Sequence, residues 1–135
     1  LSSKLRHMAD VKVLFFVESR YKVNRKRLKR AITKTLDSNG VKSQVEISVA
    51  IVGDRKMTKL NKEYRGKEGT TNILSFPLQE GEKTTLPQDN IVRLGDIVIS
   101  YPVLIKESAS EDMLVDDRAD MLIEHGLLHL MGIHH

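Results

Sequence analysis

The chain has 135 residues, of which 40% are hydrophobic and 30% charged, and it contains no cysteine. This composition is typical of one globular domain, and the lack of cysteine excludes disulfides, thiolate metal sites and a cysteine nucleophile. No apolar run approaches the roughly 18 residues that a membrane span needs, and the first residues have no apolar signal-peptide core. We therefore expect a single cytoplasmic domain over residues 1–135, with residues 1–7 a remnant of an expression vector.

The first half of the chain predicts two strands with a helix between them. Val11–Val17 is rich in β-branched and aromatic residues, which favours a strand. Asn24 is the expected N-cap of a helix whose apolar residues recur at helical spacing, and Gly40 ends that helix. Val45–Ile51 then alternates apolar and polar residues, which predicts a half-buried strand.

The charges are distributed unevenly along the chain. Eight basic residues lie between Arg20 and Lys34 without an acidic one, and seven acidic residues lie between Glu107 and Glu124 with Arg118 as their one basic neighbour. We expect the basic residues to occupy mostly the outer face of the predicted helix. This asymmetry is consistent with a polyanionic partner, and equally with a solvated face of an amphipathic helix.

The middle of the chain predicts a short helix, a strand and a loop. Asp54 is the expected cap of a helix that turns Met57, Leu60 and Tyr64 inward. The segment 71–76 reads as a strand that Pro77 stops, and residues 79–90 have no periodicity and read as a loop.

The last part of the chain predicts one strand and two helices. The strand covers 93–99, where Gly95 indicates a bulge or a close backbone approach. Pro102 fits the first turn of a helix through about residue 108, and Ser110 is the expected cap of the longest helix, which Gly132 ends. The order βαβαββαα predicts an α+β fold, in which helices pack on a small mixed sheet of about four strands and the C-terminal helix carries a histidine motif.

That motif is the strongest chemical signal in the sequence. His125 and His129 are four residues apart, so one face of a helix can offer both imidazoles to one ion. A left-handed Gly132 can turn the chain back so that His135 approaches the same ion. Three neutral imidazoles with an open fourth position are typical of a catalytic zinc site. The alternatives are two ordinary surface or core histidines, and a purification tag that begins at the end of the chain.

The same histidine spacing is found in metzincin proteases, but the residue after the first histidine differs. Those enzymes place a glutamate there as the general base. Here the position is Gly126, which cannot accept a proton. Glu124 points about 100° away around the helix and is a poor replacement. Peptide hydrolysis by that mechanism is therefore disfavoured.

Three segments together resemble the YbeY family of bacterial metal-dependent endoribonucleases. They are Asn61–Arg65 with Thr71–Pro77, Leu94–Ser100, and His125–His135. The resemblance covers most of the chain from about Val45 onward. Two positions differ from the family pattern. His134 stands where the family has an aspartate before the third histidine, and Asn72 stands where it has an aspartate near the start of the Thr71–Pro77 segment.

The resemblance implies a zincin-like α+β fold and a zinc-dependent, single-strand-specific RNA hydrolase. It further implies action on ribosomal RNA precursors, in maturation and quality control with the small ribosomal subunit. His125, His129 and His135 take the positions of the ligands of one zinc ion, whose water attacks the phosphodiester. Arg65 takes the position of the family's functionally important arginine and, with His125, is assigned to catalysis.

Further residues are weaker candidates. Arg25, Lys26, Lys29 and Arg30 on the basic helix are candidate contacts to the RNA backbone. Ser75 is either a hydrogen-bond donor in the cleft or a strand serine that the backbone satisfies. Two other functions stay open: a zincin-like metallopeptidase, which needs a different general base, and a ribosome-associated binding module in which the metal is structural.

Overall fold

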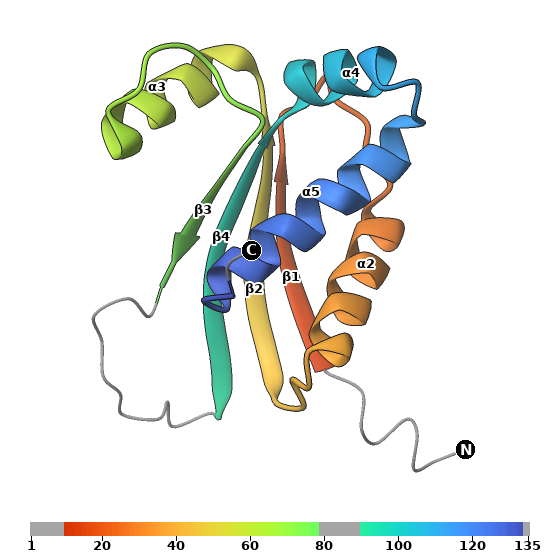
Figure 1. The fold of residues 1–135 in the computed structure, drawn as a ribbon. Coiled ribbons are helices and arrows are strands. Elements are labelled where there is room, and N and C mark those ends of the chain that lie inside the picture. Colours follow the sequence, from red (N-terminus) through yellow and green to blue (C-terminus); the bar gives the residue numbers. More distant parts are fainter. Residues whose placement is uncertain (1–9, 79–89, 134–135) are drawn as a thin grey trace.

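The computed structural model describes residues 10–78 and 90–133. Its order of elements matches the prediction, and it belongs to the α+β class (Figure 1). The elements are β1 (Asp10–Val17), α2 (Arg25–Ser38), β2 (Gln44–Val52), α3 (Asp54–Arg65), β3 (Ile73–Pro77), β4 (Ile91–Ser100), α4 (Tyr101–Ser110) and α5 (Val115–Leu130).

In the described part of the chain, the strands form one mixed sheet in the order β1-β2-β4-β3. β1, β2 and β4 run parallel, and β3 pairs with β4 in the antiparallel sense at one edge. Pro77 is the last residue of β3 and lies opposite Gly95, a position that an edge strand tolerates because the missing N–H interrupts no inner ladder.

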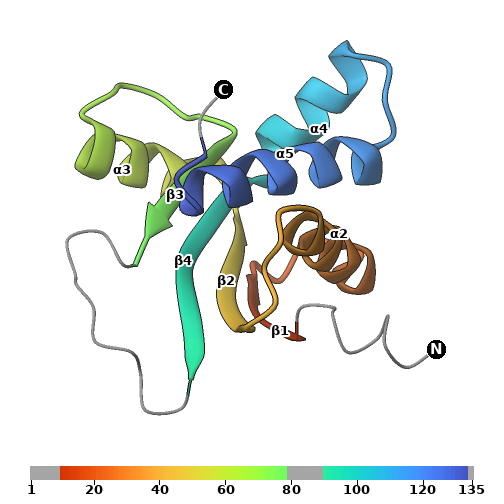
Figure 2. The same cartoon turned by 60° about the horizontal axis from the view of Figure 1, so that its bottom comes forward.

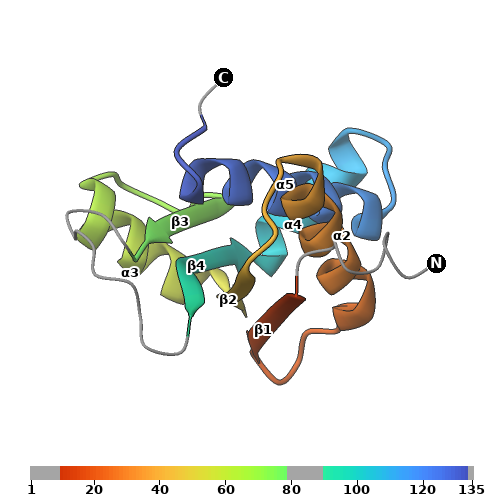
Figure 3. The ribbon, with the colours of Figure 1, turned by 90° about the horizontal axis from the view of Figure 1, so that it is seen from below.

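Helices lie on both faces of the sheet. α2 and α5 cover one face and α3 lies on the other (Figure 3). α4 continues from the end of β4 and packs beside the first turns of α5 (Figure 2). None of the helices in the described ranges combines the length and hydropathy that a membrane crossing requires.

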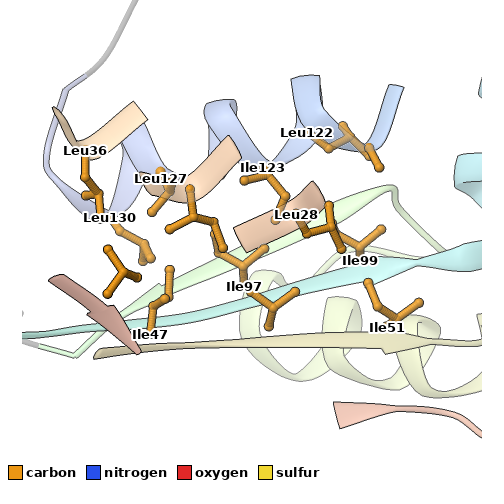
Figure 4. Close-up of a cluster of buried hydrophobic side chains, with 14 of the residues drawn as sticks. Leu28, Leu36, Ile47, Ile51, Ile97, Ile99, Leu122, Ile123, Leu127 and Leu130 are labelled. Atoms are coloured by element: carbon orange, nitrogen blue, oxygen red, sulfur yellow. The ribbon is translucent and has the colours of Figure 1, made fainter. Parts of the chain in front are cut away.

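The main core lies between the sheet and the pair α2 and α5. It forms because alternate strand residues point to the same face and meet the apolar stripes of the two helices. Figure 4 shows this cluster, which includes Leu28, Leu36, Ile47, Ile51, Ile97, Ile99, Leu122, Ile123, Leu127 and Leu130. A smaller cluster on the other face joins Met57 of α3 to Val52, Leu74 and Val98.

Several local predictions are confirmed. The Asn24 side chain accepts a hydrogen bond from the backbone N–H of Arg27, as an N-cap does, and Gly40 has the left-handed φ of +78° just beyond α2. The predicted bulge is present, since the pairing of β2 and β4 shifts between Glu46 and Ile47, next to Gly95. A Cβ at Gly95 would collide with the carbonyl oxygen of Phe76, so this close approach requires glycine.

Two predictions about α3 are wrong. Gly53, not Asp54, is the N-cap residue, and Asp54 is already helical. Its carboxylate accepts hydrogen bonds from the hydroxyls of Ser100 and Thr70 instead, which ties the start of α3 to the end of β4. Tyr64 is 64% exposed and not turned inward, because it lies at the margin of the small cluster, where its ring makes a T-shaped contact with Phe76.

The predicted start of the last helix is also wrong. Ser110 is the final residue of α4, and α5 begins at Val115 after Leu114, which makes no side-chain cap. Asp112 has a left-handed φ of +55° and turns the chain between the two helices. Two aspartates in the first turn of α5 stabilise its start through the helix dipole, which replaces the missing cap. The predicted loop over 79–90 lies outside the described residues apart from Asn90.

Candidate functional site

The histidine pair lies on the exposed side of α5, near its C-terminal end. The ring centroids of His125 and His129 are 4.7 Å apart and the rings are inclined by 54°. Both side chains are exposed. This arrangement follows from the four-residue spacing, and it lets two ring nitrogens converge on one point outside the helix. The predicted shared face is therefore present.

The turn after α5 has the predicted geometry. Gly132 has a φ of +77°, its N–H bonds to the carbonyl of His129, and the N–H of Ile133 bonds to the carbonyl of Leu128 at 2.8 Å. This pair of hydrogen bonds is the Schellman motif, which stops a helix and reverses the chain. His134 and His135 lie outside the described residues. The third ligand position therefore stays a prediction.

The two described imidazoles suit a metal ion of borderline softness such as Zn²⁺. Their ring separation agrees with two nitrogens about 2.0–2.1 Å from a common ion. Among the described residues, no group of three or more His, Cys, Asp or Glu side chains comes together. The described chain thus brings together two imidazoles, and His135, the third predicted ligand, lies outside the described residues.

Gly126 faces the opposite way, into the sheet. A Cβ on it would lie 3.0 Å from Ile73 and 3.1 Å from Ile97 at their side-chain ends, and 3.3 Å from the Ser75 hydroxyl. α5 therefore approaches β3 and β4 closely at this residue. A glutamate here would place its carboxylate in the core and not beside the histidines. The position that carries the base in metzincins is thus closed to a base in this fold.

Ser75 lies beneath α5, on the side of the sheet that faces the helix. Its hydroxyl donates a long hydrogen bond of 3.5 Å to the carbonyl of Gly126. The neighbouring Asp96 lies on the other face, where it accepts a hydrogen bond from Ser48 of the adjacent strand. Of the two interpretations of Ser75, the geometry favours a serine within a strand whose hydroxyl forms its hydrogen bond with the backbone.

Arg65 is the last residue of α3, on the face of the sheet opposite the histidines. It is exposed and makes no ion pair with another described residue. Its neighbour Tyr64 contacts Phe76 of β3 at a centroid distance of 5.1 Å, so the end of α3 lies against the edge strand. Arg65 and the histidines therefore lie on helices that cover opposite faces of the sheet, and the described residues show no contact between them.

Asn61 holds the loop that follows Arg65, a role that the sequence analysis missed. It is 3% exposed, and its side-chain amide donates to the carbonyl of Gly69 at 3.0 Å. Asn61 lies one helical turn before Arg65 and four residues after the buried Met57. The sequence did contain a signal for this role. A polar residue on the apolar face of a helix is expected to be buried, and its side chain then needs a hydrogen-bond partner such as a loop carbonyl.

The basic residues of α2 do not all share one environment. Lys26, Lys29 and Arg30 are exposed, and Arg25 is exposed with its guanidinium 5.9 Å from the Phe15 ring centroid. Arg27 instead crosses to α5, where it bonds to Asp117 at 2.6 Å and to Asp120 at 3.0 Å. These hydrogen bonds raise the pKa of Arg27 further above its ordinary value. The basic and acidic runs thus neutralise each other in part, which the sequence analysis did not anticipate.

Known proteins resemble this chain over most of its length. A sequence model of the family described as Endoribonuclease YbeY matches residues 15–135. The Endoribonuclease YbeY of Acinetobacter baylyi is 39% identical over 113 residues, which are 84% of this chain and 70% of that protein. The protein of the same name from Syntrophus aciditrophicus is 34% identical over 118 residues, which are 87% of this chain and 71% of that protein.

A solved structure shares the fold. The solution structure of TM1509 from Thermotoga maritima aligns with a TM-score of 0.58 and 21% sequence identity, over 92% of this chain and 75% of that one. This likeness supports the architecture, while the family match and the sequence identities above establish the relationship. The chain belongs to the YbeY family of endoribonucleases, hydrolases that act on RNA.

Proposed function

We propose that this protein is a zinc-dependent endoribonuclease specific for single-stranded RNA, which acts in ribosomal RNA maturation and ribosome quality control. The observation that carries this proposal is the pair of exposed imidazoles on α5, 4.7 Å apart, followed by a glycine that reverses the chain. Family membership supports the RNA substrate, and the proposal adds the metal, the strand preference and the ribosomal context. Ribosomal RNA precursors and the small subunit would then be its cytoplasmic partners.

His125 and His129 would hold the ion, with His135 as the third ligand. When bound, zinc supplies Lewis-acid polarisation of a phosphoryl oxygen and lowers the pKa of a water molecule towards neutrality. Neutral imidazoles are required for this ligation, so protonation of the histidines in acid would weaken it. The Schellman turn at Gly132 reverses the chain, which supports a third ligand from the residues that follow it.

Arg65 would bind the RNA backbone next to the cut. A guanidinium can grip phosphate oxygens with two parallel hydrogen bonds and stabilise the additional negative charge of the transition state. Arg65 makes no described ion pair that would compete with this contact. An RNA strand that passes around the exposed edge of β3 would meet the histidines on one face and Arg65 on the other.

This path around a sheet edge favours single-stranded RNA. A strand that wraps an edge must bend sharply over the thickness of one sheet, which an unpaired strand does easily and a stiff A-form duplex does not. The chain has few aromatic residues, 4% in total, so stacking contributes little and recognition would depend on phosphates and shape. The proposal therefore predicts weak preference for base identity.

The test compares wild type with His129→Ala and Arg65→Ala on three substrates: unpaired RNA, the same RNA as a duplex, and casein. We expect cleavage of unpaired RNA alone. His129→Ala should lose both cleavage and bound zinc, whereas Arg65→Ala should lose cleavage by about 100-fold or more and keep its zinc. Arg55→Ala, at the other end of α3, is the matched control and should behave like wild type.

Other results would favour the alternatives. Casein cleavage would indicate a peptidase, although Gly126 leaves no room for the usual base. Tight RNA binding and bound zinc without turnover would indicate a binding module with a structural ion. Cleavage that survives His129→Ala would show that the activity comes from a contaminant.

A further inference from the structure

A groove runs between the outer faces of α2 and α5, on the same side of the sheet as the histidines. Its volume is about 1010 Å³. The wall from α2 carries four basic residues, and the wall from α5 carries Met121 and two acids. The basic residues are Lys26, Lys29, Arg30 and Lys34.

One basic residue that lines this groove is ion-paired, whereas the other four form no ion pair with another described residue. Arg27 lines the groove but is held by Asp120 at 2.9 Å and Asp117 at 2.6 Å, so it braces the two helices together. Without that ion-paired group, the lining keeps four basic residues against Asp37 and Glu124. The groove therefore retains an excess of positive charge along one wall, where Lys26, Arg30 and Lys34 follow one another at intervals of about one helical turn and Lys29 adjoins Arg30.

The groove is aligned with the histidine pair. Met121 is 48% exposed and lies four residues before His125, which lies four residues before His129. Residues at this spacing form one stripe along a helix, and each step advances about 6 Å along the axis. A chain that lies in the groove against Met121 thus reaches the histidines after one further turn of α5.

We propose that this groove binds the stretch of single-stranded RNA that flanks the cleavage site. Lys29, Arg30 and Lys34 contact successive phosphates. Glu124 lies at the end of the groove next to His125, where the RNA leaves the basic wall. This inference rests on the proposed function for the direction of the strand, and it assigns to this chain an RNA contact distant from the reacting phosphate.

A regular row of positive charge beside an RNA-hydrolysing site suits a polyphosphate backbone. Because phosphate contacts release counterions, they make binding fall steeply as salt rises. They add affinity without base specificity, which fits the small number of aromatic residues in the chain. Arg25, which the sequence analysis grouped with these residues, does not line the groove and is not part of the contact.

The experiment measures equilibrium binding of a fluorescein-labelled, unstructured RNA of about 16 nucleotides, with EDTA present so that no turnover interferes. It compares wild type with Lys29→Gln/Arg30→Gln/Lys34→Gln. The matched control is Lys12→Gln/Lys42→Gln/Lys106→Gln, which removes three exposed lysines elsewhere and gives the same net charge. Circular dichroism confirms that both variants are folded.

We expect the groove variant to bind at least about tenfold more weakly at about 100 mM salt, and its slope of log affinity against log salt to fall by about 2. The control variant should stay within about threefold of wild type. Equal weakening of both variants would overturn the proposal, since diffuse charge would then suffice. Unchanged affinity of the groove variant would overturn it as well.

A competition experiment with an acidic peptide distinguishes an RNA ligand from an acidic protein partner. If a polyglutamate peptide displaced the labelled RNA as effectively as unlabelled RNA of equal charge, the groove would be a docking site for an acidic protein and the proposal would be wrong. Because the assay measures binding without cleavage, a failure of the groove proposal is distinguishable from a failure of the proposed enzymatic function.

Discussion

The two faces of the sheet differ in how they are built and in what they carry. The face under α2 and α5 buries a large cluster that reaches from Val11 to Leu130, and it presents the histidine pair on a rigid helix. The face under α3 buries a small cluster around Met57, and it leaves Leu14 and Phe16 of β1, the other edge strand, exposed. In the proposed function, the histidines would need to be held firmly to bind a metal ion, whereas Arg65 could adjust when it binds phosphate. The unequal cores would match these unequal demands.

The largest expected effect comes from filling the close contact between α5 and the sheet. Gly126→Glu should destabilise the protein by about 5 kcal/mol or more, because a charged side chain would enter the space between Ile73 and Ile97. Urea unfolding measures this. Met121→Glu adds the same charge to an exposed position of the same helix and should change stability by less than about 0.5 kcal/mol. A stable, folded Gly126→Glu variant would contradict the packing described for α5.

Truncations in the two cores compare the faces directly. Ile97→Ala, in the large cluster, should cost about 4 kcal/mol, and Leu74→Ala, in the small cluster on the edge strand, about 2.5 kcal/mol. The difference arises because neighbours of an edge strand can close around a cavity more easily than those of a central strand. Chemical denaturation of both variants gives the comparison. Equal losses would mean that the two cores are equally rigid.

Zinc should stabilise the whole folded protein but add local protection on only one face of the sheet. At a zinc concentration about 100 times the dissociation constant, binding to the native state adds about 2.7 kcal/mol. Hydrogen exchange should slow in the last turn of α5, and α3 should show no local slowing beyond this global gain. His125→Ala and His129→Ala should each remove the effect. Uniform slowing in a His129→Ala variant would indicate binding elsewhere.

The smallest effect concerns the brace between α2 and α5. Arg27→Met should lower the urea midpoint modestly, and the loss should shrink as salt screens the ion pairs with Asp117 and Asp120. The pKa of Arg27 is raised in the folded state, so its contribution is fully present below its ordinary pKa and is lost only in strongly alkaline solution. The difference between Arg27→Met and wild type should thus stay constant between about pH 6 and 9 if the carboxylates keep their charge. Lys29→Met is the control for removing a charge without an ion pair.

Sequence reasoning succeeded where a signal is local. The caps at Asn24 and Gly132 depend on hydrogen bonds within a few residues, so residue type and position predict them. It failed where distant groups competed for the same side chain. Asp54 reads as a cap, but Ser100 and Thr70 hold its carboxylate from other elements. Ser110 reads as a cap too, but the preceding helix extends through it.

The sequence by itself determined the element order and the shared face of His125 and His129, because periodicity and spacing act within one helix or strand. The element order indicated the mixed sheet, and the resemblance of three segments indicated the family. Only the tertiary structure decided that Gly126 faces a closed core, that Arg27 joins α5, and that a basic groove leads to the histidines. Those properties depend on which helix faces lie against each other. That pairing is set by packing between segments about 90 residues apart, which no local pattern encodes.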